Sequence, residues 1–178
     1  MVDDGERLAV SGKREPPERT VALARAALET VLDPEVPVLS VVELGIVREV
    51  VVEGDSVTVT LTPTYSGCPA MHVIETEIRA ALAAAGFGGV ELKTVYAPAW
   101  TTDWISAPAR EKLRAYGIAP PGSMPAQLVT LEGPAQRTGC PFCGSLDTSL
   151  VSEFGATACK SLYSCRSCQQ PFEHFKAF

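Results

Sequence analysis

The chain has 178 residues, a formal net charge of −6 and an apolar fraction of 46%. This size fits one ordinary domain with a small appendage, and no apolar run is long enough to span a membrane. Residues 1–135 carry a net charge of −7 and residues 136–178 carry +1. The chain therefore lacks the basic charge that nucleic-acid binding normally needs, and a nucleic-acid partner is disfavoured. The N-terminus has acids and prolines where a signal peptide needs an apolar segment, so a cytoplasmic setting is expected.

Residues 1–19 are charged, contain Gly and Pro and show no periodicity, so this segment is predicted to be disordered. Thr20 is a suitable N-cap for an amphipathic helix. That helix is predicted to end near residues 32–33, because Pro34 disfavours helical geometry in the residue before it. Two acids, Asp33 and Glu35, flank this proline. On residue chemistry alone they indicate a rigid turn in which Asp33 acts as a cap.

Residues 46–62 predict two antiparallel strands joined by a hairpin turn at Glu53-Gly54-Asp55. Apolar residues at helical spacing then predict a helix that ends at Gly86, and GGVELKTVYA supplies a third strand. A strand reached through a helix can be parallel to its neighbour. The predicted fold is therefore α+β: a small three-stranded mixed sheet with helices on one face, spanning residues 20–118.

The segment after the third strand predicts a short helix that begins after Ser106 and ends at Gly117. Trp100 and Trp104 precede it, and packing over the core is favoured over the alternative, a hydrophobic partner surface. Residues 119–136 contain the Pro- and Gly-rich run APPGSMPAQ. This run predicts a linker to a second module at residues 137–178.

Cys68 lies in the loop TPTYSGCP, between the second strand and the following helix. With Pro69 in the first helical position, the thiol would lie beside unpaired backbone N–H groups and is expected to be partly thiolate. Cys68 is therefore a candidate nucleophile or metal ligand. The alternative is a small buried residue that fills the corner between strand and helix. His72 could reach this sulfur, although a surface position is favoured.

The tail contains two Cys-x-x-Cys motifs with 21 residues between them. Paired knuckles of this kind bring four thiolates to one tetrahedral point, and a metal supplies the stability that so short a region lacks. Four thiolates suit structural zinc, but iron fits the same set. The fifth thiol of the module, Cys159, is interpreted as buried filler in preference to a spare ligand, and His174 has no position left to occupy. The predicted ligands are Cys140, Cys143, Cys165 and Cys168.

Several motifs together resemble one family. DPE at residues 33–35, ELGIV at 43–47 and LTPTYSGCP at 61–69 resemble the small cytosolic iron–sulfur assembly domain that includes SufT. CPFCGS, FGATACKSLYSC and CQQPFEHFKAF extend beyond that domain. Together the motifs resemble the PaaD family of accessory proteins, which are encoded with the multicomponent phenylacetyl-CoA epoxidase of aerobic phenylacetate degradation.

The resemblance implies a maturation role that is not enzymatic. Cys68, with the Asp33 and Glu35 loop, would carry iron or a transient iron–sulfur cluster for the epoxidase reductase or oxygenase component. Because one ligand cannot hold a cluster, a homodimer or a client complex is expected. The chain also lacks the helical Glu-x-x-His pattern of di-iron proteins and the Gly-rich fingerprint of dinucleotide binding. The alternative is a scaffold that docks a client through its zinc ribbon and the Trp100/Trp104 loop without carrying a cluster.

Overall fold

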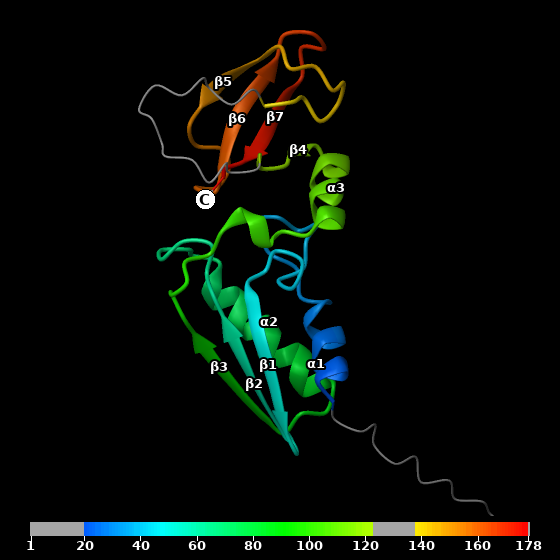
Figure 1. The fold of residues 1–178 in the computed structure, drawn as a ribbon, viewed down its shortest axis with the longest axis vertical. Helices are drawn as coiled ribbons and strands as arrows, with labels where there is room; N and C mark the ends of the chain where they lie inside the picture. The colour runs from blue at the N-terminus through cyan, green and yellow to red at the C-terminus, as the bar shows by residue number, and fades with distance from the viewer. Residues whose placement is uncertain (1–19, 123–137, 178) are drawn as a thin grey trace, which may run out of the picture.

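The computed structural model describes residues 20–122 and 138–177. Two β-sheets follow one another along the long axis of the molecule, with helix α3 (Ala107–Tyr116) between them (Figure 1). The predicted disordered segment, 1–19, and most of the predicted linker lie outside the described residues. Among the described residues, no helix is long and apolar enough to cross a membrane.

Helix α1 (Val21–Leu28) begins where the sequence predicts, because the side chain of Thr20 accepts a hydrogen bond from the Leu23 N–H at 3.2 Å. It ends four residues earlier than predicted. The Thr30 hydroxyl donates to the Ala27 carbonyl at 2.7 Å, and such a local side-chain bond competes with continuation of the helix. The N–H groups of Thr30 and Val31 bond three residues back, at Ala27 and Leu28. The chain therefore leaves the helix before Pro34.

The first sheet has the predicted mixed topology, in the order β1-β2-β3. Strands β1 (Val47–Glu53) and β2 (Ser56–Leu61) form an antiparallel hairpin, and β3 (Gly89–Thr94) pairs with β2 in parallel. Gly54 supplies the positive φ of 59° in the hairpin turn. The parallel pairing is possible because helix α2 (Met71–Ala84) carries the chain back along the sheet.

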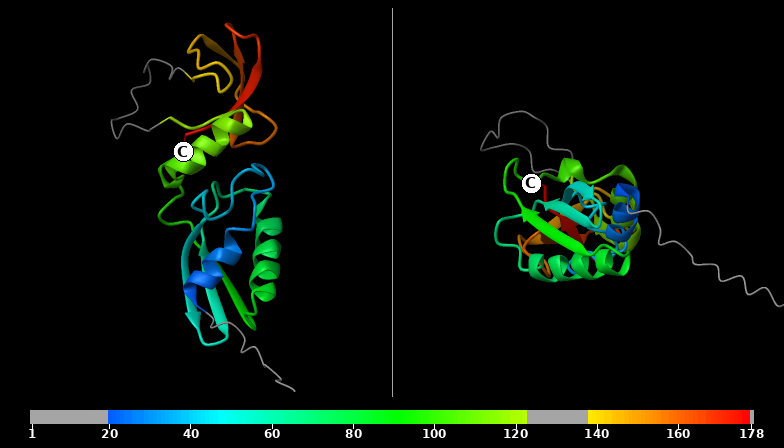
Figure 2. Two further views of the ribbon diagram at one scale, coloured as in Figure 1. Left: turned by 90° about the vertical axis from the view of Figure 1, so that its right-hand side faces the viewer. Right: turned by 90° about the horizontal axis from the view of Figure 1, so that it is seen from below.

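Helices α1 and α2 cover one face of this sheet, as the left view of Figure 2 shows. The residues that they bury are apolar and lie at helical spacing, while β2 buries alternate residues against them. The α+β class and the placement of the helices are therefore confirmed. The shared core includes Leu28, Val57, Val59, Leu61, Ile74, Ile78 and Leu82.

The segment before α3 packs onto this core. The indole Nε1 of Trp100 donates to the Leu44 carbonyl at 2.9 Å, and the side chain is buried. Trp104 lies in the short 3₁₀ helix η1 (Thr102–Trp104), and the Arg48 guanidinium lies 3.3 Å from the centre of its ring. The packing interpretation of the two tryptophans is confirmed. Ser106 also caps α3 as predicted, by accepting from the Ala109 N–H at 3.3 Å.

The second sheet has four strands in the order β4-β7-β6-β5. Strands β5 (Thr148–Ser152), β6 (Lys160–Cys165) and β7 (Pro171–Phe175) form an antiparallel ribbon. The short strand β4 (Ile118–Ala119) precedes the linker and pairs with β7 in parallel. Ala119 therefore belongs to this sheet, although the sequence places it at the start of the linker.

The two sheets share one apolar core. Phe175, from the last strand of the ribbon, is 1% exposed and belongs to the same buried cluster as the first sheet and its helices. Its ring centre lies 6.1 Å from that of Trp100. Cys159, the residue before β6, is also buried in this cluster. The ribbon is thus packed against the first domain at the level of the Asp33–Glu35 loop.

Candidate metal centres

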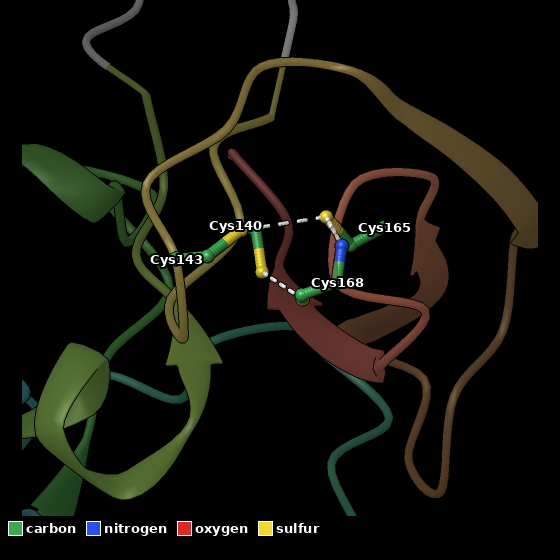
Figure 3. Close-up of side chains that lie close together, drawn as sticks. All are labelled: Cys140, Cys143, Cys165 and Cys168. Carbon is green, nitrogen blue, oxygen red and sulfur yellow. Dashed lines mark hydrogen bonds between the residues drawn. The ribbon is translucent and has the colours of Figure 1, made fainter.

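Four cysteines converge between two turns of the ribbon module, as Figure 3 shows. Their Sγ atoms all lie within 4.8 Å of one another. The Cys140–Cys168 sulfur distance is 3.7 Å, and the Cys143–Cys165 distance is 3.6 Å. Tetrahedral zinc with Zn–S bonds of about 2.3 Å requires sulfur separations of about 3.8 Å. The four-cysteine group therefore fits a tetrahedral metal ion.

The backbone around this group also suits thiolate ligands. The Cys168 N–H donates to the Cys165 sulfur at 3.5 Å. This N–H is the main reason that the pKa of Cys165 is lowered to about 7, because a hydrogen bond to the charged form favours it. Gly144 follows Cys143 with a φ of +74°, and Gln169 follows Cys168 with a φ of +62°. Each knuckle thus ends in a left-handed turn, which keeps its two sulfur atoms on the same side.

Cys68 forms a separate site at the edge of the first domain. Its side chain is half-buried. Helix α2 begins at Met71, so Cys68 and Pro69 lie in the turn before the helix. The expected thiolate is wrong for the resting protein: burial raises the pKa of Cys68. The Ala70 N–H acts in the opposite direction, and the negative charges of Glu35 and Asp33 raise the pKa further.

The Asp33 carboxylate closes the loop that faces Cys68. Its Oδ1 accepts hydrogen bonds from the N–H groups of Glu35 at 2.7 Å and Val36 at 2.9 Å. Asp33 is only 5% exposed, and burial is the main reason that its pKa is raised. The geometry is that of the predicted capped turn. Asp33 therefore fixes the conformation of the loop, and the Glu35 side chain points away from this turn.

The Glu35 side chain contacts the ribbon module. The Cys159 thiol lies 3.4 Å from Glu35 Oε2, and Lys160 Nζ donates to the Glu35 carbonyl at 3.2 Å. Lys160 also pairs with Glu173 at 2.8 Å, within the ribbon. Cys159 is 3% exposed, as a filler would be. However, its sulfur faces a carboxylate and the Thr157 hydroxyl, which lies 3.1 Å away, and this contact was not predicted.

Tyr65 is a half-buried residue of the loop that bears Cys68. Burial raises its pKa to about 12, and the charges of Cys68, Glu35 and Cys159 act in the same direction. A neutral tyrosine at this position can donate to a thiolate or to a sulfide ligand. Tyr65 is not predicted as a site residue from the sequence. It lies in the same TPTYSGCP loop as Cys68, but a single tyrosine is too common to indicate a site.

The two histidines do not belong to either group of sulfur atoms. His72 is exposed on α2, in agreement with the favoured surface position. His174 is half-buried, its Nδ1 lies 3.3 Å from the Ser161 hydroxyl, and burial lowers its pKa. It is also absent from the four-cysteine group. This placement agrees with the prediction that the four-cysteine site has no position for it.

Comparison with protein families divides the chain in the same two parts. Residues 22–94 match the family described as "Iron-sulfur cluster assembly protein", and residues 124–176 match the "PaaD zinc beta ribbon domain". A solved domain of unknown function, DUF59, from Bacillus anthracis is 29% identical, with a TM-score of 0.48 over 52% of this chain and 88% of that one. The two family matches define the class of protein: an iron–sulfur assembly domain joined to a zinc ribbon.

Curated relatives specify the family further. A protein of Escherichia coli (strain K12) that is named as a putative component of 1,2-phenylacetyl-CoA epoxidase is 48% identical over 153 residues, which is 85% of this chain and 89% of that protein. The chain therefore belongs to the PaaD family. An "Fe-S protein maturation auxiliary factor" of Porphyromonas gingivalis is 39% identical over 48% of this chain and 83% of its own length. The Bacillus subtilis factor YitW is 40% identical over 47% of this chain and 83% of its own length.

Proposed function

We propose that this chain is a non-catalytic accessory protein that assists iron–sulfur cluster or di-iron maturation of the phenylacetyl-CoA epoxidase complex in aerobic phenylacetate catabolism. Its cargo is iron or a transient cluster, carried at Cys68. Family membership supports the epoxidase as client, and the names of the shorter relatives support the maturation role. The observation that carries the proposal is a half-exposed thiol beside the Asp33–Glu35 loop, apart from the four-cysteine group.

The two sulfur sites suit different tasks. The four-cysteine group offers a complete ligand set, and such a closed site holds a structural ion. Zinc is the proposed occupant, with iron as the alternative ion for the same ligands. Cys68 offers one sulfur with access to solvent, which suits temporary binding of a soft metal. Ligands that complete the cargo site come from the client or from a second copy of the chain, so the active form is a client complex or a homodimer.

The acids of the loop have different roles in this proposal. Asp33 is a positioning residue, because its carboxylate is occupied by the two backbone N–H groups of its own turn. Glu35 extends from that turn to the Cys159 thiol and can offer an oxygen to iron. The client is either the ferredoxin-type reductase or the oxygenase component, and general iron–sulfur assembly proteins supply the cargo.

The direct test is anaerobic reconstitution of the purified protein with ferrous iron and sulfide. Visible absorption should develop and remain with the protein through gel filtration, in addition to the zinc that the ribbon holds. Cys68→Ser should lose this absorption and keep its zinc. Ser66→Ala is the matched control, because Ser66 is an exposed residue of the same loop. Wild-type protein that stays colourless, or Cys68→Ser protein that colours equally, would contradict the proposal.

The exposed surface of the ribbon favours one alternative, a scaffold that docks a client without carrying a cluster. Trp100 is buried and cannot serve as the docking residue suggested by the sequence. Instead, large apolar side chains are exposed on the ribbon: Phe142, Leu146, Leu150, Val151 and Phe154. Exposed apolar side chains of this kind are typical of partner surfaces. A protein that stays colourless on reconstitution yet co-purifies with an epoxidase component would favour the scaffold.

A further inference from the structure

Lys160 is a charged residue that is buried where the ribbon meets the first domain. It is the first residue of β6 and is 4% exposed. Its Nζ pairs with the Glu173 carboxylate of β7 at 2.8 Å and donates to the backbone carbonyl of Glu35 at 3.2 Å. A lysine is rarely buried to this extent unless its charge is paired. One partner of this lysine lies in the ribbon and the other lies in the assembly domain.

The carbonyl that Lys160 contacts belongs to the Asp33–Glu35 loop. Asp33 Oδ1 accepts from the N–H groups of Glu35 and Val36, and these bonds fix the turn internally. Two further contacts reach the loop from the ribbon. The Lys160 ammonium donates to the Glu35 carbonyl, and the Cys159 thiol donates to Glu35 Oε2 at 3.4 Å. Two consecutive ribbon residues therefore hold both the backbone and the side chain of Glu35.

The ribbon side of this contact is well braced. One oxygen of Glu173 pairs with Lys160, and the other accepts from the Ala156 N–H at 2.8 Å. Strand β6 is paired with β5 on one side and with β7 on the other. The same strand ends at Cys165, a member of the four-cysteine group. A single strand in the middle of the ribbon thus connects the metal group with the contact to the Asp33–Glu35 loop.

We propose that Lys160 is a positioning residue for the cargo site, because from the ribbon it fixes the loop that carries Asp33 and Glu35. The inference rests on the proposed function, in which Glu35 offers an oxygen to iron. It adds that the ribbon contributes to cargo binding through a side chain that does not touch the cargo. A charged donor makes a stronger hydrogen bond to a carbonyl than a neutral one does. A purely structural ion pair would instead affect the stability of the whole fold without an effect confined to the loop.

The test is hydrogen–deuterium exchange of the full-length, zinc-saturated protein, followed by mass spectrometry. Lys160→Met keeps an unbranched side chain but removes the charge and the donors. The N–H groups of Glu35 and Val36 should then exchange about tenfold faster, because the loop has lost a hydrogen bond from a charged group. Peptides from the β1–β2 hairpin should be unchanged. Unchanged exchange in the loop, or equal acceleration in the loop and the hairpin, would overturn the proposal.

Two further variants guard against a general loss of structure. Lys176→Met is the matched control: it is the same chemical change at another ribbon lysine, whose Nζ lies 4.4 Å from the centre of the Phe154 ring, and its loop should exchange as in the wild type. The double variant Lys160→Met/Glu173→Gln leaves no unpaired charge and keeps an acceptor for the Ala156 N–H. Its loop should exchange as fast as that of Lys160→Met, and exchange at the wild-type rate would overturn the proposal.

Iron release separates a positioning role from a structural one. After anaerobic reconstitution with ferrous iron and sulfide, Lys160→Met should lose iron to the ferrous chelator ferrozine about tenfold faster than the wild type. Lys176→Met should match the wild type, and zinc content should be equal in all three proteins. Equal iron release from Lys160→Met and the wild type would overturn the positioning role alone. Wild-type protein that takes up no iron would overturn the proposed function itself.

Discussion

The Cys159 sulfur lies 3.4 Å from the Glu35 carboxylate, although 124 positions separate the two residues in the sequence. This contact joins the end of the zinc ribbon to the acidic loop of the assembly domain. It means that the ribbon does more than extend the chain, because one of its residues reaches the site at which iron is proposed to bind. The two modules should therefore behave as one unit in folding and in metal binding.

Truncation of Phe175 tests whether the modules share a core. Phe175→Ala removes a ring that is 1% exposed and packs beside Trp100. It should lower the free energy of unfolding by about 3–5 kcal/mol. Phe154→Ala, at a ring that is 66% exposed, should change it by less than about 0.5 kcal/mol. Urea unfolding followed by tryptophan fluorescence provides the measurement, and equal effects of the two variants would show that Phe175 is not part of the core.

Removal of the ribbon metal should destabilise both modules. A structural zinc contributes much of the folding free energy of so small a domain, and Phe175 and Cys159 link that domain to the first core. A strong chelator, or the variant Cys165→Ser, should therefore lower the melting temperature by on the order of 10 °C or more. Calorimetry of the zinc-loaded protein should show one transition. Two independent transitions, with the first domain unaffected by chelation, would contradict the shared core.

Glu43 should stabilise the protein in a pH-dependent manner. Burial opposes its charge, but the hydrogen bond from Lys112 and that from the Ser40 N–H are together stronger, so its pKa is lowered from 4.5. A carboxyl with a lowered folded pKa stabilises the fold above its unfolded pKa, and this stability is lost as the pH falls through the folded pKa. Glu43→Gln should therefore cost about 0.5–1 kcal/mol above pH 4.5. Urea unfolding of both proteins should give a difference that disappears at lower pH, and a difference that stays constant would exclude the ion pair as its cause.

The Cys68 thiol should react slowly at neutral pH. Burial raises its pKa, and the charges of Glu35 and Asp33 raise it further. Because only the thiolate is nucleophilic, alkylation by iodoacetamide in zinc-loaded protein should still be rising at pH 9, as followed by mass spectrometry. Glu35→Gln should increase the rate at pH 8 by about two- to fivefold. A rate that levels off below pH 8 would show that Cys68 is largely thiolate at neutral pH, as its position before the helix suggests from the sequence.

The parts of the fold that local chemistry determines could be predicted from the sequence. The two glycines, Gly54 in the hairpin turn and Gly117 after α3, adopt the positive φ that glycine tolerates. The Ser106 side chain caps the first turn of α3. The spacing of the Cys-x-x-Cys pairs likewise predicts the four-cysteine group. Each of these signals lies within a few residues of the structure that it specifies.

The parts that depend on distant contacts could not be predicted. Strand β4 has two residues and no periodicity, and it exists only because β7 offers it a partner. Cys159 meets Glu35 only because the ribbon folds back on the first domain. The protonation state of Cys68 was predicted wrongly for a related reason: the sequence indicates a helix entrance but does not show how much neighbouring segments bury the thiol.

The account depends most on Cys68 as the carrier of cargo for the epoxidase. The most direct measurement is phenylacetyl-CoA epoxidase activity in cells that lack their native copy of this protein and are supplied with wild-type, Cys68→Ser or Ser66→Ala chains at equal levels. The wild type and Ser66→Ala should restore activity, and Cys68→Ser should leave it at the level of the deletion strain. Full restoration by Cys68→Ser would contradict the carrier role.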